Sequence, residues 1–315
     1  MTPLIAAAAS TAYRDDTTEE AIRSLLEAGA DVNADGGYFG NALQAALTPN
    51  TRRCDFHDIK KTSNVIRMLL GAGANINAVG GYYGTALQAA AAVRTTDGII
   101  SDIIMILLDA GADVNIQAGH YGNALQAAAA ADADRFGDLR SYSSSISVVH
   151  MLLDANANIN AQGGYYGNAL QAAAATAANP GIVGSEVSDA ILINMLLELG
   201  ADVNAHGGSY SSALQAAVIC RSSNAPLMVI KMLLNDGADV DAKGGSCGNV
   251  FDAILVTGCN SYEACKGKHD GGALQILDLF VEAGIKGAAA ARDQLFDYYG
   301  WNEGAIAMYK TWGWP

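Results

Sequence analysis

The sequence predicts an all-α solenoid, in which similar helix pairs stack side by side along one axis. Two short sequence motifs, here called words, recur along its 315 residues, and such self-similarity indicates a repeat architecture. The first word, Ala-Leu-Gln, begins at Ala42, Ala86, Ala124, Ala169 and Ala213, with a degenerate copy at Val250. The second, a leucine pair, begins at Leu25, Leu69, Leu107, Leu152, Leu196 and Leu233, with Phe280-Val281 as a seventh copy.

The spacing of the two words divides each unit into a fixed half and a variable half. From each leucine pair to the next Ala-Leu-Gln the distance is 17 residues in all six cases, for example from Leu25 to Ala42. The return distance varies from 20 to 30 residues. Because insertions are tolerated in loops, the variable half must hold a loop. The predicted unit is therefore turn, helix, loop, helix.

Local signals support each element of the fixed half. The leucine pair ends an amphipathic helix, and a glycine such as Gly29 or Gly200 supplies the left-handed residue that stops it. A residue suited to accept the first free amides of the next helix precedes each Ala-Leu-Gln word. These predicted N-caps are Asn41, Thr85, Asn123, Asn168, Ser212 and Asn249. We expect replacement of the second leucine, at Leu153 or Leu197, by alanine to cost about 2–5 kcal/mol as a core change.

One unit cannot bury its apolar helix faces alone, so the units are predicted to stack. Residues 1–286 form the predicted array of seven units, with breaks near residues 34, 78, 116, 161, 205 and 242. The alanine runs of the first helices fit close packing between units. Residues 287–315 hold all three tryptophans, Trp301, Trp312 and Trp314. We interpret this segment as an aromatic-rich helical C-terminal cap, with an exposed partner-binding tail as the alternative.

These words resemble the ankyrin repeat, a turn and helix pair whose signature begins Thr-Pro-Leu-His. Thr2-Pro3-Leu4 matches that start, and the segments Leu25 to Asn33 and Leu107 to Asn115 match the end of its second helix. Two features depart from the usual pattern: the lengthened connection from first to second helix, and the Gly-Gly-aromatic-aromatic-Gly turn. This turn sequence, with its Tyr-Gly-Asn-Ala-Leu-Gln-Ala-Ala repeats, is most similar to that of fungal-type ankyrin arrays of receptor-like proteins. The resemblance implies a protein-binding scaffold, and a role as the sensor array of a larger receptor stays open.

Composition narrows the classes of partner. Lys and Arg total 18 against 32 Asp and Glu, so the surface field repels nucleic acid and anionic lipid. The acidity is interpreted as a source of solubility, with a specific basic protein partner as the alternative. Five scattered cysteines favour reduced thiols, and no run approaches the roughly 18 apolar residues of a membrane span. We therefore expect a cytoplasmic monomer without nucleic-acid or membrane partners.

The turns carry the candidate binding residues. The first four hold an aromatic pair, and serine takes the first place at Ser209 and Ser246. The first member is expected to face out over the concave side, and the second to pack between neighbouring turns. Stacking should place them in ladders with steps of about 10 Å, the ordinary spacing of packed helices. A varied residue precedes the glycines, and an unconstrained turn tip explains it equally well. The predicted partner-binding residues are Asp35, Tyr38, Tyr82, Gln117, His120, Gln162, Tyr165, His206 and Tyr210. The asparagines Asn33, Asn77, Asn115, Asn160 and Asn204 are interpreted as braces of their own turns.

No catalytic, cofactor-binding or metal-binding residue is predicted. The glycine words lack the lysine of a Walker motif and the strand of a dinucleotide fingerprint. Cys259, Cys265 and His269 match no zinc spacing. Whether the chain is an enzyme stays open, because a solenoid can assemble a site from several repeats. The alternative function is therefore a small-molecule-binding or catalytic groove that uses the Tyr, His and Asp residues of the concave wall.

Overall fold

The computed structural model describes residues 1–12, 17–48, 59–93, 99–131, 142–177, 186–219, 225–245, 248–255 and 272–299. Within these ranges the regular structure is helical apart from isolated β-bridges in the turns, such as Gly163 to Gly167, which confirms the all-α class. The predicted variable loops lie almost wholly outside the described residues, as do Cys259, Cys265, His269 and the three tryptophans. None of the helices described could cross a membrane, since none is both long and apolar enough.

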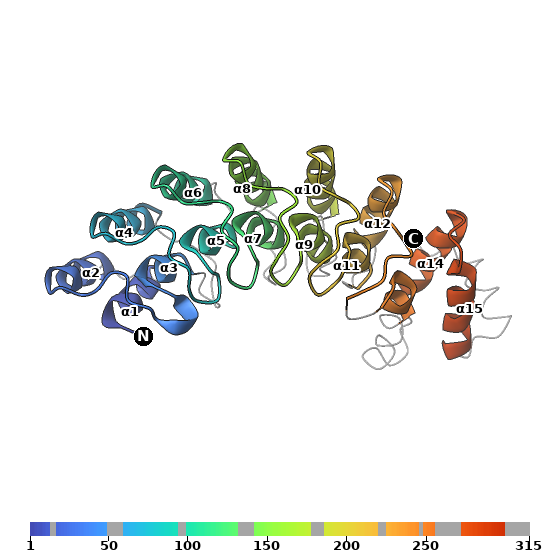
Figure 1. Ribbon diagram of the computed structural model, residues 1–315, viewed down its shortest axis with the longest axis horizontal. Coiled ribbons are helices and arrows are strands. Elements are labelled where there is room, and N and C mark those ends of the chain that lie inside the picture. The colour runs from blue at the N-terminus through green and yellow to red at the C-terminus, as the bar shows by residue number, and fades with distance from the viewer. Residues whose placement is uncertain are drawn as a thin grey trace.

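The helices form two layers that curve into an arch (Figure 1). The inner layer holds the first helix of each repeat: α1 (Pro3–Ala9), α3 (Ala42–Leu47), α5 (Ala86–Ala91), α7 (Ala124–Ala130), α9 (Ala169–Thr176), α11 (Ala213–Ile219) and a helix at 250–255. The outer layer holds the second helices: α2 (Thr18–Glu27), α4 (Ile59–Gly71), α6 (Ile99–Asp109), α8 (Tyr142–Asp154), α10 (Glu186–Glu198), α12 (Ala225–Asn235) and α14 (Gly272–Glu282). Short 3₁₀ helices lie at η1 (Ser10–Ala12) and η2 (Gly37–Phe39).

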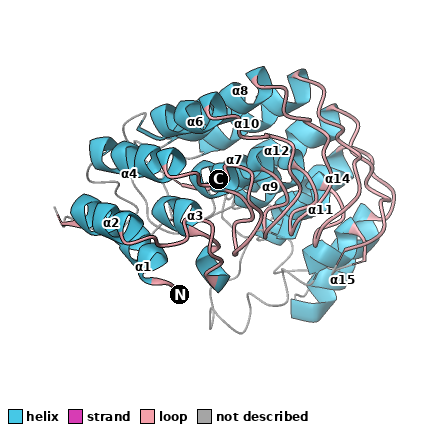
Figure 2. Cartoon of the chain, turned by 60° about the vertical axis from the view of Figure 1, so that its left-hand side comes forward, coloured by secondary structure: helices cyan, strands magenta, loops and turns pink. Residues whose placement is uncertain are grey.

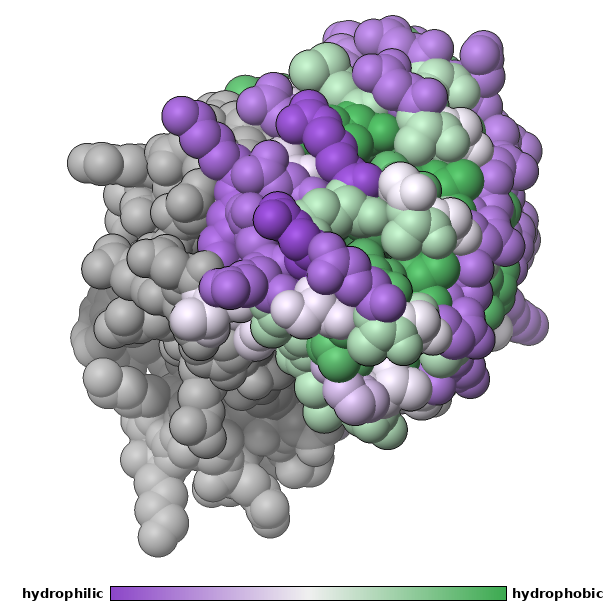
Figure 3. Space-filling view, turned by 90° about the vertical axis from the view of Figure 1, so that its left-hand side faces the viewer, coloured by the Kyte–Doolittle hydropathy of each residue, from purple (hydrophilic) through white to green (hydrophobic). Residues whose placement is uncertain are grey.

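The C-terminal end of the described chain is α15 (Ala288–Tyr299), which packs against α14. Arg292 Nη1 lies 3.0 Å from Asp278 Oδ1, so an ion pair joins the two helices. The predicted cap at 287–315 is described only as far as residue 299 and stays a prediction. At the opposite end, hydrophobic residues gather at the surface between hydrophilic borders (Figure 3).

Four inner helices, α3, α5, α7 and α9, are buried on every face. All residues of α7 and α9 are buried, and most of them are alanines that let neighbouring helices approach closely. In the outer layer the first leucine of the pair is fully buried from the second repeat to the sixth, as at Leu152 and Leu196. The second leucine is half-buried, so the prediction that named Leu153 and Leu197 as core positions is wrong by one residue. An adjacent helical residue points about 100° away from its neighbour, which explains the difference.

The predicted start and stop signals are confirmed. All six predicted N-caps accept a hydrogen bond from the backbone three residues later, for example Asn168 Oδ1 from Gln171 N at 2.7 Å. The glycines that end the second helices have positive φ, as Gly200 does at 90°. In the fourth repeat, Asn156 takes the place of glycine with φ 65°. Asparagine is among the residues that adopt this conformation most readily.

The glutamine of each Ala-Leu-Gln word joins two repeats, a role that the sequence analysis missed. Gln126 is fully buried, and its Nε2 donates to Ala161 O at 2.9 Å, at the end of its own repeat, and to Gly167 O at 3.0 Å in the next repeat. Its Oε1 accepts from Asn123 N at 3.3 Å, which completes a capping box in its own repeat. The other glutamines that donate to the following repeat in this way are Gln44, Gln88, Gln171 and Gln215.

The turn asparagines also connect neighbours, which corrects their interpretation as braces of their own turns. Asn115 Nδ2 donates to Asn156 O at 3.0 Å, and its Oδ1 accepts from Asn158 N at 2.8 Å. Both partners belong to the following repeat. Equivalent bonds to the following repeat are made by Asn33, Asn77, Asn160 and Asn204.

Successive turns lie in direct backbone contact. Tyr165 N donates to His120 O at 2.8 Å, and Ser209 N donates to Tyr165 O at 2.8 Å. This approach requires glycine: a Cβ added at Gly167 would lie 2.8 Å from the backbone of Gly207 and collide with the Gln171 side chain. The turns therefore form a continuous bonded edge.

We predict that Gln126→Ala lowers the free energy of unfolding by about 2–5 kcal/mol, because the Asn123 amide and the Ala161 carbonyl lose their partner and Gly167 O loses one of two. Chemical denaturation measures the change. The matched control is Gln117→Ala, which removes an exposed glutamine and should stay within about 0.5 kcal/mol of the wild type. Equal losses from the two substitutions would contradict the bridging role.

We predict that Gly167→Ala destabilises the chain more than Gly200→Ala does. Both glycines have φ between 90° and 100°, so each substitution places alanine in the left-handed region at a cost of about 1–2 kcal/mol. A Cβ at Gly200 meets nothing within 4 Å, whereas one at Gly167 meets the next turn. Overpacking should add about 1–3 kcal/mol at Gly167 alone. Parallel thermal melts test this, and equal losses of stability would show that the turns separate freely.

Candidate functional site

The segments between each second helix and the next first helix form one continuous edge of the molecule. We call this surface the turn edge and define it as residues 28–41, 72–85, 110–123, 155–168, 199–212 and 236–245. Figure 2 shows the loops of successive repeats running side by side along one side of the array. All nine predicted partner-binding residues belong to this edge.

Four first-member aromatic residues form a stacked row. Ring centroids are 5.4 Å apart from Tyr38 to Tyr82, 4.8 Å from Tyr82 to His120 and 5.0 Å from His120 to Tyr165. Their planes differ by only 16–22°. The expected step of about 10 Å is therefore wrong. Helix packing does not set the step, because backbone hydrogen bonds hold adjacent turns at the spacing of neighbouring β-strands, about 4.8 Å.

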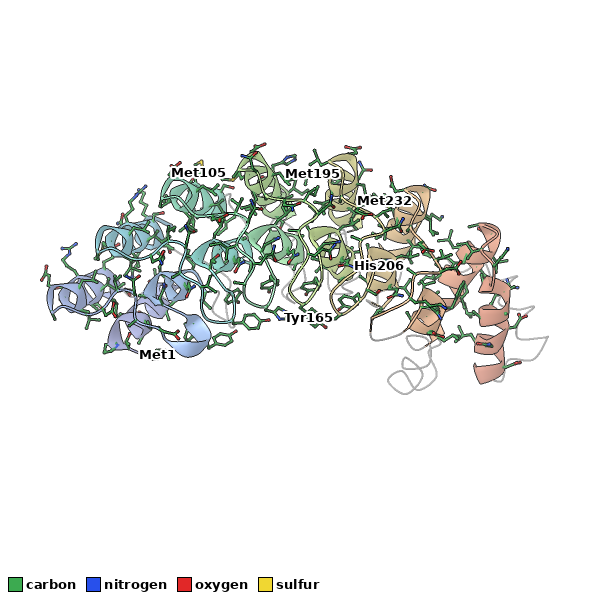
Figure 4. All side chains as sticks on the ribbon, viewed as in Figure 1. Met1, Met105, Tyr165, Met195, His206 and Met232 are labelled. Atoms are coloured by element: carbon green, nitrogen blue, oxygen red, sulfur yellow. The ribbon has the colours of Figure 1, made fainter. Side chains whose placement is uncertain are left out.

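The row presents ring edges to solvent. Tyr82 and His120 each lie between two stacked neighbours, so both faces of each ring are covered. Tyr38 and Tyr165 are the most exposed members, at 55% and 43%. Figure 4 shows Tyr165 at the tip of its turn, on the side away from the helices. A ligand would meet phenol hydroxyls, imidazole atoms and ring edges.

The second members form an inner row that supports the first. Tyr83, Tyr121, Tyr166 and Tyr210 stack in order at 6.1–6.3 Å. Each first member meets the second member of its own turn edge to face, as His120 meets Tyr121 at 5.1 Å. Tyr121 is only 9% exposed. Tyr210, which we had grouped with the binding residues, is half-buried in this inner row because serine holds the first place in its turn.

The varied residues at the turn tips are all exposed: Asp35, Val79, Gln117, Gln162, His206 and Lys243. Some are also held in place. Asp35 Oδ1 accepts from Gly37 N at 3.1 Å. The Gln117 and Gln162 side chains lie directly above Gly163 and Gly207 of the following turns, where a Cβ would approach within 2.6 Å of each amide oxygen. The tips of adjacent repeats therefore form one surface.

Acidic side chains dominate the turn edge. Its acidic residues are Asp31, Asp35, Asp113, Asp202, Asp236, Asp239 and Asp241, all exposed, and its one basic residue is Lys243. The outer helices that lead into this edge end in further acids: Glu27, Asp109, Asp154 and Glu198. The total charge alone does not reveal this distribution, although it is readable from the fixed half of each repeat.

The inner helices contribute no exposed side chain to this surface. Every residue of α3, α5, α7 and α9 is buried. The predicted concave surface combines turns with first helices, and these four helices add no exposed side chain to it. Their alanines are too short to reach past the neighbours that enclose them.

Within the described ranges, no group of three His, Cys, Asp or Glu side chains lies close enough together to hold a metal ion. His120 and His206 lie in different turns, and His150 lies on α8 in the outer layer.

Comparisons with known proteins identify the fold. No protein-family model matches the chain, and no curated protein does. The human ASB11 ankyrin repeat domain is similar over 80% of this chain and 91% of its own, with 22% identity and a TM-score of 0.51. The ankyrin repeat domain of Bcl-3, a member of the IkappaB protein family, covers 80% of this chain and 93% of its own, with 21% identity and a TM-score of 0.47. An ankyrin repeat domain from Acinetobacter baumannii AYE covers 75% and 98%, with 23% identity and a TM-score of 0.48.

The likeness to the ASB11 domain agrees with the features of the chain itself, namely its stacked helix pairs, bonded turns and glycine stops. The chain therefore has the ankyrin-repeat fold.

Proposed function

We propose that this chain is a protein-interaction module that binds a protein partner along its turn edge. The observation that carries the proposal is the stacked row of Tyr38, Tyr82, His120 and Tyr165, held with ring edges toward solvent. Tyrosine is enriched at interface hot spots, since it combines a large apolar surface with a polar hydroxyl. Because backbone bonds already order these turns, a partner meets a preformed surface and little further entropy is lost.

The shape of the row favours a broad partner over the alternative of a small-molecule or catalytic groove. A flat ligand binds best between two aromatic faces, and here the faces of Tyr82 and His120 are already occupied. A long, shallow strip suits protein recognition better than the concave pocket that small ligands prefer. Within this proposal, residues 1–286 form the binding array and 287–315 its cap. In a larger receptor, the turn edge would be the sensing surface.

We predict that changing Tyr82, His120 and Tyr165 together to Ala abolishes partner capture. Affinity capture from cells, read out by mass spectrometry, compares the variant with the wild type. The fold should persist, since Ser209 occupies the equivalent position in the fifth turn and its backbone amide still bonds to Tyr165 O at 2.8 Å. Circular dichroism verifies this.

The matched control replaces Met105, Ile191 and Met228 with Ala. These side chains lie on α6, α10 and α12 and are similarly exposed, at 49–51%, but they belong to the outer helices. We expect the control to recover the wild-type partners. If the variant with Tyr82, His120 and Tyr165 changed to Ala also recovers them at the same yield, the turn edge is not the binding surface.

A further inference from the structure

We propose that the partner segment seated on the turn edge is a basic α-helix lying lengthwise along the aromatic row. This inference rests on the proposed function and adds the chemistry and conformation of the partner. Charge and spacing on the turn edge carry it independently of each other.

Charge complementarity selects a basic partner. In the described part of the first five repeats, the fixed halves at 25–47, 69–92, 107–131, 152–177 and 196–219 contain no Lys or Arg. Their acids, among them Asp31, Asp113 and Asp202, are exposed on the same edge as the aromatic row. A surface of one sign attracts segments of the opposite sign and speeds their association.

The helix ends strengthen this field. The outer helices α2, α4, α6, α8, α10 and α12 all lead into the turn edge with their C-termini, the negative end of the helix dipole. Basic residues commonly compensate that end, yet the last turns of these helices hold none. Several carry acids instead, such as Asp154 and Glu198. The uncompensated negative potential therefore follows the whole row.

The step of the aromatic row selects a helix. Three consecutive steps of 5.4, 4.8 and 5.0 Å separate Tyr38, Tyr82, His120 and Tyr165. An α-helix repeats a side chain on one face about every 5.4 Å, at positions i, i+4, i+7 and i+11. An extended strand repeats on one face about every 6.6 Å, and it loses register with the rings after two steps.

The contacts available at each side chain of the aromatic row suit arginine or lysine. A long side chain can lay its methylene stem across the exposed ring edges and place its charged end near the carboxylates. Each turn then offers an aromatic edge with a phenol or imidazole, and the turns of Tyr38 and His120 also carry acids, at Asp31, Asp35 and Asp113. A helix with one basic stripe would use successive turns in the same way.

The test uses three synthetic peptides of equal length and charge, each with about 18 residues that include four arginines in a background of alanine and glutamine. The first places arginine at i, i+4, i+7 and i+11, the second distributes the four around the helix, and the third keeps the stripe but contains central prolines that prevent a helix. Fluorescence anisotropy measures the Kd of each for the full chain at low salt. We expect the striped helix to bind about tenfold more tightly than either of the others, as the loss of a few exposed ion pairs would give.

A variant with fewer acidic side chains tests whether the exposed acids of the turn edge attract the basic helix. Asp31, Asp113 and Asp202 are changed to Asn, a substitution that the chain itself supports. Asn158 Oδ1 accepts the same turn bond, from Asn160 N at 3.0 Å, as Asp113 Oδ1 accepts from Asn115 N at 2.9 Å. The variant should keep its melting temperature and bind the striped peptide about tenfold more weakly.

Equal affinities for the three peptides, or unchanged binding by the Asn variant, would overturn this inference. Tighter binding of the proline peptide would overturn the helical part and indicate an extended basic segment. The proposed function has a separate test, because the variant lacking the Tyr82, His120 and Tyr165 side chains can lose its cellular partners whether or not those partners are basic helices.

Discussion

The bond from each buried glutamine to the backbone of the following repeat is the interaction on which the rest of the structure depends. Gln126 closes its own helix cap and binds Ala161 at the end of its own repeat and Gly167 of the next repeat through one side chain. The turn asparagines add a second connection in the same direction. With both in place, the turns are close enough for direct backbone bonds, and the aromatic rings stack as a consequence.

Two different spacings then shape the molecule. The turns are spaced by backbone hydrogen bonds, with ring steps of 4.8–5.4 Å, whereas packed helices are ordinarily about 8–10 Å apart. An array whose turns lie closer together than its helices bends toward the turns, as the arch in Figure 1 does. The aromatic row and the acids consequently lie on the inner side of the curve, where one elongated partner can contact several repeats.

The repeat architecture could be predicted from sequence because each local signal agreed with the others. Constant spacing, glycine stops such as Gly200 and caps such as Asn168 all depend on nearby residues. The role of Gln126 could not be read in the same way, because its partners lie 35 and 41 residues away. The spacing of the aromatic rings and the hydrogen-bond partners of Asn115 were predicted wrongly for the same reason, since both depend on residues of the neighbouring repeat. The buried inner helices escaped prediction because their exposure depends on how the repeats pack.

The central claim is that the turn edge is bonded from repeat to repeat and is therefore ordered before any partner arrives. Hydrogen exchange at the backbone amides of Tyr82, His120, Tyr165 and Ser209 tests it most directly. Each amide lies in a turn, yet each donates to the preceding turn at 2.8 Å. The account predicts that these amides exchange as slowly as amides inside the flanking helices. Exchange as fast as that of an unstructured loop would contradict it.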